Sequence, residues 1–145
     1  MDILTALKIS ASGLSAQRTR LNVLSSNLAN ANSTQSADGS GPYKRKDPIF
    51  AETPLGSFDK TLDKASQKLS AVNVTGIVED QTPGARVYDP SHPQADKDGF
   101  VTMPNVNVVS ELTDIMQTSR SYEANLSAMK AAKEMISAAL GIGRS

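Results

Sequence analysis

The single histidine of the chain, His92, is the residue best suited to metal or acid–base chemistry. It lies in the segment YDPSHPQADKDG, where Asp89, Asp96 and Asp98 could join it in a carboxylate–imidazole site. However, prolines stand on both sides of the histidine, and no second imidazole is available. The DKDG stretch also lacks the other ligands of a calcium loop, including its terminal glutamate. We therefore expect a solvated turn, with no metal and no cofactor.

Nucleophilic catalysis has no better support. The chain has many serines, but the only imidazole that could act as a general base for them is that of His92, which lies between two prolines. No G-x-S-x-G, P-loop or dinucleotide-binding glycine pattern occurs, and the lack of cysteine excludes thiolates, disulfides and cysteine-ligated zinc. The acidic pair Glu79–Asp80 is more easily explained as a polar strand end. The sequence predicts that the protein is not an enzyme and has no small-molecule substrate.

The only basic run is YKRKD, residues 43 to 47. Three bases without interleaved aromatic residues are a weak signal for phosphate binding, so a solvated loop or an ion-pairing patch facing another subunit is favoured. Fifteen basic and fifteen acidic residues cancel, and we expect no nucleic-acid partner. The start, MDILTALKIS, is not typical of a cleaved signal peptide, and no window approaches the roughly 18 apolar residues of a membrane span.

Two long helices are predicted to position the rest of the chain. In the N-terminal third, leucines recur every seventh residue, with Ile3, Leu4, Ala11 and Leu24 at neighbouring positions, which predicts a helix over about residues 3 to 30. In the C-terminal third, a second heptad pattern runs from Val108 to Leu140, between Pro104 and the glycines 141 and 143. A helix of that length, roughly 50 Å, outspans a small domain and needs a partner along it.

The residues between these helices are predicted to form a smaller, β-containing insertion. Residues 33 to 56 are rich in Ser, Gly, Pro, Asp and Lys, which is typical of an extended loop. Alternation around Val72, Val74 and Ile77 indicates a strand, and ARVYDP and GFVTMP indicate two more, with DKDG as a turn. The expected fold is mainly α: two long terminal helices packed as an antiparallel coiled coil (1–33 and 104–145), with the insertion at 34–103.

Asparagines cluster where the first helix should end, in VLSSNLANANS. Asparagine is a poor helix former because its amide competes for nearby backbone groups. Asn30 or Asn32 would suit the left-handed conformation that closes a helix. Asn27 and Asn30 either finish the helix or hydrogen-bond at a subunit contact, within the chain or across to a neighbour.

Four separated strings carry a resemblance to a known family. They are, in chain order, NVLSSNLANANS, GPYKRKDPIF, DPSHPQADKDGFVTMPNVN and SRSYEANLSAMKAAKEMISAALGIGR. The first and last resemble the shared terminal motifs of the flagellar axial proteins of the rod and hook. The two middle strings resemble the proximal rod proteins within that family.

The resemblance implies a structural subunit, exported through the flagellar type III apparatus without a cleaved signal and assembled in the periplasm. Its terminal helices would form an inner coiled-coil domain around the axial channel, and the middle segment an outer domain or arm. Implied partners are copies of the same chain, other rod proteins, and the membrane-embedded ring and rod-adaptor proteins at the rod base. The rod would transmit torque and enclose the export channel.

The residues expected at helix packing or subunit contacts follow from the heptads and these motifs. They are Leu7, Leu14, Leu21, Leu28, Asn27, Asn30, Val108, Leu112, Ile115, Arg120, Tyr122, Glu123, Leu126, Met129, Ile136 and Leu140. Arg120 and Glu123 match charged positions of the C-terminal motif and could pair between subunits. A rival interpretation is a cytoplasmic helical adaptor or export chaperone that binds partners without polymerising, but it does not explain the long middle segment.

Overall fold

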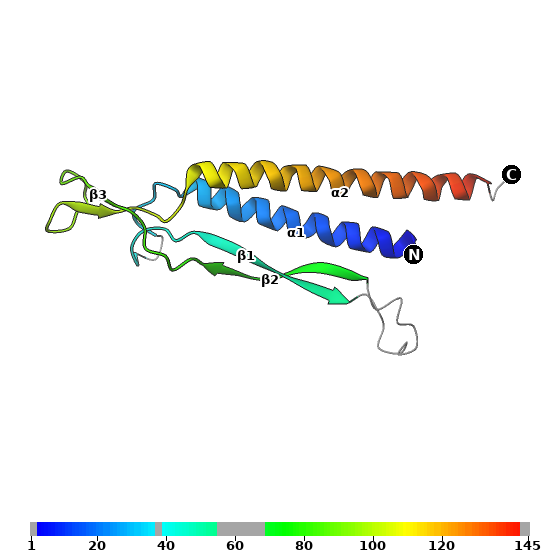
Figure 1. Cartoon of the computed structure of the whole chain (residues 1–145), viewed down its shortest axis with the longest axis horizontal. Helices are drawn as coiled ribbons and strands as arrows, with labels where there is room; N and C mark the ends of the chain where they lie inside the picture. The colour runs from blue at the N-terminus through cyan, green and yellow to red at the C-terminus, as the bar shows by residue number, and fades with distance from the viewer. Residues whose placement is uncertain (1–2, 37–38, 55–68, 143–145) are drawn as a thin grey trace. The chain divides into compact units, whose positions relative to one another are not determined.

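The computed structural model describes residues 3–36, 39–54 and 69–142. It consists of two long helices separated in sequence by two small two-stranded sheets (Figure 1). The elements, in chain order, are α1 (Ile3–Ala29), β1 (Lys46–Pro54), β2 (Ser70–Glu79), β3 (Arg86–Tyr88), β4 (Phe100–Thr102) and α2 (Val108–Ile142). The predicted class, mainly α with a β-containing middle, is confirmed at this level. Among the described helices, none is both long and apolar enough to cross a membrane.

The last turn of α1 is closed by the amide of Asn30. The Asn30 backbone N–H donates to the Ser26 carbonyl at 3.1 Å, and its side-chain Nδ2 donates to the same oxygen at 2.8 Å. The Ser33 hydroxyl then donates to Asn30 Oδ1 at 3.2 Å. A side chain that competes for backbone carbonyls thus ends the helix within one residue of the predicted position. The expected left-handed conformation at Asn30 or Asn32 is wrong, because neither residue has a positive φ.

The start of α2 is capped by Asn107. Its Oδ1 accepts the backbone N–H groups of Val109 at 3.1 Å and Ser110 at 3.2 Å, two of the donors that a helix start leaves without partners. Pro104, three residues earlier, ends the extended segment that leads into this cap. The helix therefore begins where its backbone donors first find a side-chain acceptor.

Strand β1 corrects the expectation of a loop from residue 33 to residue 56, because residues 46–54 pair with β2. Pro48 and Pro54 concealed this strand in the sequence, since proline donates no backbone hydrogen bond and is tolerated mainly in edge strands. Beyond the end of β2, the Asp80 N–H donates to the Arg45 carbonyl at 2.8 Å. Positions 37–38 and 55–56 of the expected loop lie outside the described residues.

Strands β3 and β4 confirm the two short strands that the sequence predicted around DKDG. They pair antiparallel with Arg86 opposite Thr102 and Tyr88 opposite Phe100. The Tyr88 and Phe100 rings meet edge to face, with centroids 5.3 Å apart. Before β3, a side chain at Gly84 would place its Cβ 1.8 Å from the Met103 carbonyl oxygen, so only glycine fits there.

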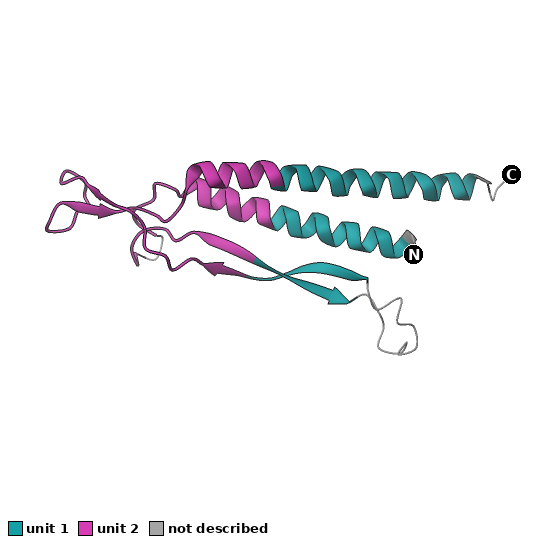
Figure 2. Cartoon of the chain, viewed as in Figure 1, with its two compact units in different colours: residues 1–19, 49–76, 118–145 teal, residues 20–48, 77–117 magenta. Residues whose placement is uncertain are grey.

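The chain divides into two compact units, and each takes part of both helices (Figure 2). Unit 1 comprises residues 1–19, 49–76 and 118–145, and unit 2 comprises residues 20–48 and 77–117. The expected domains 1–33, 34–103 and 104–145 stay a prediction. The buried apolar side chains are Ala16 and Ala132 in unit 1, and Val23, Leu24, Ala31, Tyr43 and Val101 in unit 2.

Within unit 1, small side chains occupy the buried helix positions. Besides the two alanines, Thr118 is buried, and a Cβ built on Gly13 of α1 would lie 3.1 Å from Asn125 Nδ2 of α2. The N–H of Val72 in β2 donates to the Ser12 hydroxyl of α1 at 3.1 Å. The fully buried helix positions of unit 1 therefore bring little apolar area, and the larger apolar side chains there are at most half-buried.

Candidate functional site

The most deeply buried polar side chain of unit 2 belongs to Asn27, which has no exposed surface. Its Nδ2 donates to the Lys46 carbonyl at 2.9 Å and to Glu111 Oε2 at 3.1 Å. Its Oδ1 accepts the Lys46 N–H and the Tyr43 hydroxyl, both at 2.9 Å. Both donors and both acceptor positions of the amide are thus used, as burial of an amide requires.

Glu111, in the first turn of α2, supplies the charge at the centre of this network and is 1% exposed. Its Oε1 accepts from Arg45 Nε at 2.5 Å, and Arg45 Nη1 also meets Asp47 Oδ2 at 2.5 Å. The hydrogen bond to Glu111 raises the pKa of the Arg45 guanidinium above its ordinary value. The positive end of the α2 dipole lies at this turn and favours a carboxylate there.

The segment from Tyr43 to Lys46 is the third part of the network. Backbone hydrogen bonds, in addition to those of its side chains, hold it in place. The Arg45 N–H donates to Asn105 Oδ1 at 2.8 Å, and Asn105 Nδ2 donates to the Asp80 carbonyl at 3.3 Å. The Tyr43 N–H donates to the Ser33 carbonyl at 3.0 Å. The end of α1, the start of α2 and the basic run 43–46 are therefore joined by directional hydrogen bonds. We name Asn27, Tyr43, Arg45, Lys46 and Glu111 the Asn27 network.

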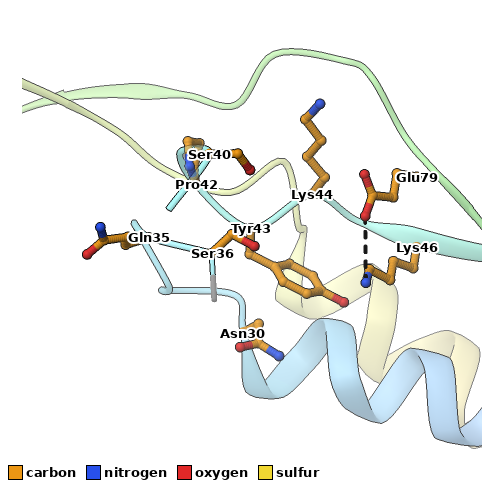
Figure 3. A pocket seen from close by; sticks show the side chains of 9 residues that line it. All are labelled: Asn30, Gln35, Ser36, Ser40, Pro42, Tyr43, Lys44, Lys46 and Glu79. Atoms are coloured by element: carbon orange, nitrogen blue, oxygen red, sulfur yellow. Dashed lines mark ion pairs between the residues drawn. The ribbon is translucent and has the colours of Figure 1, made fainter. Parts of the chain in front are cut away.

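A polar pocket of about 260 Å³ opens beside the network (Figure 3). The Tyr43 ring lies between it and α1, and Lys46 Nζ pairs with Glu79 Oε1 across 3.6 Å. The residues that line it are Asn30, Gln35, Ser36, Ser40, Pro42, Tyr43, Lys44, Lys46 and Glu79. Its lysines are engaged: Lys44 Nζ donates to Gln81 Oε1 at 2.7 Å. Both lysines among its described lining residues therefore have partners.

The segment around His92 is a turn whose carboxylates accept its own backbone N–H groups. Asp89 Oδ1 accepts the Ser91 N–H at 3.1 Å and its hydroxyl at 2.7 Å, and Asp96 Oδ1 accepts the Phe100 N–H at 2.9 Å. These hydrogen bonds hold the pKa values of both carboxyl groups below their ordinary range. Among the described residues, no group of three or more His, Cys, Asp or Glu side chains could hold a metal ion.

The structure places the residues expected at helix contacts in three environments. Asn27 is buried and bonded within the chain, and Asn30 closes α1. The half-buried ones are Leu7, Leu14, Leu21, Leu28, Ile115, Tyr122, Leu126, Met129 and Ile136. The exposed ones are Val108, Leu112, Arg120, Glu123 and Leu140. Their part in contacts between subunits stays a prediction.

The most buried positions of α2 form a heptad that the sequence analysis missed. Glu111, Thr118 and Ala132 are buried, and Asn125, which completes the seven-residue spacing, is half-buried. This series lies one residue before the expected series of Leu112 and Leu126. A search for apolar residues cannot find it, because its members are polar or small. The repeat itself, with a carboxylate, a hydroxyl and an amide in succession, is the signal that was available.

Two family models match the ends of the chain. The model described as "Flagella basal body rod protein" matches residues 7–35. The model described as "Flagellar basal body rod FlgEFG protein C-terminal" matches residues 97–142. The first covers all of α1 except its first four residues, and the second covers β4 and all of α2.

Curated relatives match the chain over nearly its whole length, and each bears the name flagellar basal-body rod protein FlgC. The protein of Salmonella typhimurium is 40% identical over 145 residues, which cover 99% of this chain and all of the relative. The protein of Bacillus subtilis is 39% identical over 151 residues, with the same coverage. The protein of Borreliella burgdorferi is 37% identical over 152 residues and covers 98% of both chains.

Proposed function

We propose a mode of assembly for this chain, which belongs to the FlgC family of flagellar basal-body rod proteins. The chain is a structural subunit of the flagellar basal-body rod and not an enzyme, as the relatives' names and their full-length similarity establish. It assembles with other rod components in the basal body. The comparisons give no support to a cytoplasmic adaptor or chaperone.

In the assembly that we propose, the two helices of each subunit pack as an antiparallel coiled coil and form an inner domain (1–33 and 104–145). The hydrogen bond between Asn27 and Glu111 supports this pairing within a subunit, as does Gly13, whose lack of a side chain lets Asn125 approach α1 closely. Apolar residues such as Leu112 and Leu140 are left for contacts with neighbours. Contacts between unlike surfaces generate an open helical array, which would serve as the torque-transmitting shaft and export channel. Residues 34–103 form the outer arm.

We further propose that ordering of the terminal helices is coupled to assembly. The fully buried helix positions in unit 1 are Ala16, Thr118 and Ala132, whose small side chains remove little apolar area from water, and the larger apolar side chains of these helix segments are at most half-buried. Such burial does not offset the conformational entropy of two long helices. A loosely ordered chain suits threading through the type III export apparatus without a cleaved signal peptide. It would gain order in the periplasm, at the ring and adaptor proteins of the rod base.

The substitution Leu126→Asp tests the helix contacts. Leu126 is half-buried, and a carboxylate there would be desolvated by any partner that packs on α2. We expect the variant protein to be exported but not to assemble into a rod, so that the strain carrying it does not swim. The matched control is Ser127→Asp, which adds the same charge at an exposed neighbouring position. Normal swimming of the Leu126→Asp strain would refute the role of this helix face.

Two measurements on the purified chain test the rest of the proposal. Sedimentation at high concentration separates polymerisation from an adaptor-like protein, which would stop at a dimer. Circular dichroism at micromolar dilution tests the coupling of order to assembly. Full helicity with cooperative melting of the dilute monomer would refute that coupling.

A further inference from the structure

The first turns of α2 in unit 2 carry an exposed apolar stripe. Val109 is 73% exposed, Met116 59%, Leu112 46% and Val108 41%. Positions 109, 112 and 116 are spaced as i, i+3 and i+7, which places them on one face of the helix, and Val108 borders it. Large apolar residues clustered in this way on a surface mark an interaction site more often than scattered ones do. We call these four residues the Val109 face.

The two units carry opposite net charges although the whole chain is neutral. Unit 2 contains six basic and nine acidic residues, a net charge of −3, and unit 1 contains nine basic and six acidic residues, a net charge of +3. The signs are unchanged when only the described residues are counted. Opposite net charges on two surfaces steer their encounter and disfavour contacts between like surfaces.

Unit 1 carries exposed apolar and basic side chains on its own helix segments, and Lys133 and Leu140, seven residues apart, lie on one face of α2. Leu140 is 65% exposed, Leu4 62% and Met135 59%. Lys130 and Lys133, on the same stretch of α2, are also exposed. Each unit therefore has exposed apolar side chains, set in surroundings of opposite net charge.

We propose that the Val109 face of one copy docks on the face of α2 that carries Lys133 and Leu140 in unit 1 of a second copy. This inference rests on the proposed polymerisation and adds which surfaces meet. A contact between two Val109 faces would bring together two units of net charge −3, whereas the unlike contact pairs −3 with +3. Because the two surfaces differ, the contact is heterologous and each bound copy leaves a free surface for the next.

Cysteine cross-linking can identify the contact directly, because the chain has no native cysteine. Two variants, Val109→Cys and Leu140→Cys, are given different affinity tags, mixed at the concentration at which the chain sediments, and oxidised. We expect the cross-link between the two variants to exceed the Val109→Cys homodimer. Ser110→Cys, exposed in the same turn but outside the face, is the control and should give little of either product.

Ionic strength provides the second readout. Raising the salt concentration from about 0.01 M to about 1 M shortens the Debye length from about 30 Å to about 3 Å. We expect the yield of the mixed cross-link to fall several-fold across this range, because the opposite charges of the two units are screened.

Sedimentation of the same mixtures distinguishes failure of this inference from failure of the proposed function. Polymers that sediment normally but give mainly Val109→Cys homodimers, or no cross-link through Val109→Cys, would overturn the inference and leave polymerisation intact. Samples that neither sediment nor cross-link would overturn both. A mixed cross-link that is insensitive to salt would overturn the electrostatic part of the inference.

Discussion

Unit 2 and unit 1 are built from the same two helices but are held by different kinds of contact. In unit 2, α1 and α2 are joined through the amide of Asn27 and the carboxylate of Glu111, with defined partners and distances. In unit 1, Gly13 faces Asn125, and Ala16 and Ala132 are buried. Hydrogen bonds of fixed geometry therefore specify the helix pairing in unit 2, and close approach of small residues characterises unit 1.

This difference indicates that the two segments of each helix have different structural roles. A network of satisfied polar groups specifies one arrangement, because any other alignment leaves buried groups without partners. A contact between small residues costs little to separate and gains from additional packing. We infer that unit 2 sets the helix register and that unit 1 depends more strongly on neighbouring subunits. The following substitutions test that inference.

The largest effect is expected for Asn27→Asp. The change removes the Nδ2 donations to the Lys46 carbonyl and to Glu111, and it adds a second carboxylate about 3 Å from the first. We expect unit 2 to lose about 3 kcal/mol of stability, which corresponds to a roughly 100-fold loss of amide protection. Hydrogen exchange of the Lys46 and Glu111 N–H groups is the measurement.

Asn32→Asp is the matched control for this prediction, since it makes the same chemical change at an exposed position five residues along the chain. It should leave exchange in both segments unchanged. Equal effects of the two substitutions would show that added charge, and not the Asn27 network, governs the stability of unit 2. Unchanged protection in Asn27→Asp would contradict the register role directly.

An intermediate effect is expected in unit 1, for Gly13→Leu. A Cβ at this position already lies 3.1 Å from Asn125 Nδ2, so a leucine must push α2 away, at a cost of about 1–3 kcal/mol. Gly13→Ala should instead be neutral or slightly stabilising. Its helix propensity gains up to about 1 kcal/mol, and Asn125 meets the methyl group with the end of a flexible side chain.

The measurement is the sedimented fraction together with the helical circular dichroism of the assembled protein. Gly141→Ala, where nothing lies within 4 Å of the new Cβ, is the control for helix propensity alone. We expect Gly13→Leu to lower both quantities and the two alanine variants to preserve them. Assembly of Gly13→Leu at the level of the unchanged chain would show that close approach at Gly13 is dispensable.

The smallest effect on stability is expected when the pH is lowered, at the turn around His92 in unit 2. Hydrogen bonds from the Phe100 N–H lower the pKa of Asp96, and those from Ser91 lower the pKa of Asp89. A lowered pKa in the folded turn stabilises it at every pH above the ordinary value of 3.8. That stabilisation is lost as the pH falls from 3.8 through the lowered pKa values of Asp89 and Asp96, where both carboxylates become protonated.

Nuclear magnetic resonance of the Ser91 and Phe100 amides, followed from about pH 5 to about pH 2.5, measures this transition. In Asp96→Asn the response of Phe100 should disappear while that of Ser91 remains. A Phe100 response in that variant would mean that another group titrates at this turn.

The two helices could be predicted because their determinants are local. The spacing of Leu7, Leu14, Leu21 and Leu28 and the position of Pro104 lie within the segments that they shape. Strand β1 could not be predicted, since its pairing with β2 depends on residues far along the chain and Pro48 and Pro54 indicated a loop. The caps of α2 were equally local, and Asn107 could have been recognised as its first acceptor.

The Asn27 network was only partly accessible from sequence. Asn27 stood out as a poor helix former among leucines. Its partner Glu111, however, lies 84 residues away and is of a residue type that usually faces solvent. Taken alone, Glu111 resembles an exposed glutamate, and only its seven-residue spacing to Thr118 and Asn125 marked it as buried. Arg45 was likewise assigned to a solvated or intersubunit basic run, and the structure instead pairs its guanidinium within the chain.

The fully used amide of Asn27 also has a mechanical consequence. Its bonds to the Lys46 backbone attach the basic run to α1, and the Arg45–Glu111 ion pair attaches the same run to α2. Hydrogen bonds loaded in parallel must break together, whereas bonds loaded in series open one at a time. We infer that a force pulling on the strand that begins at Lys46 is shared by α1 and α2, because both attachments must break before the strand separates from the helices.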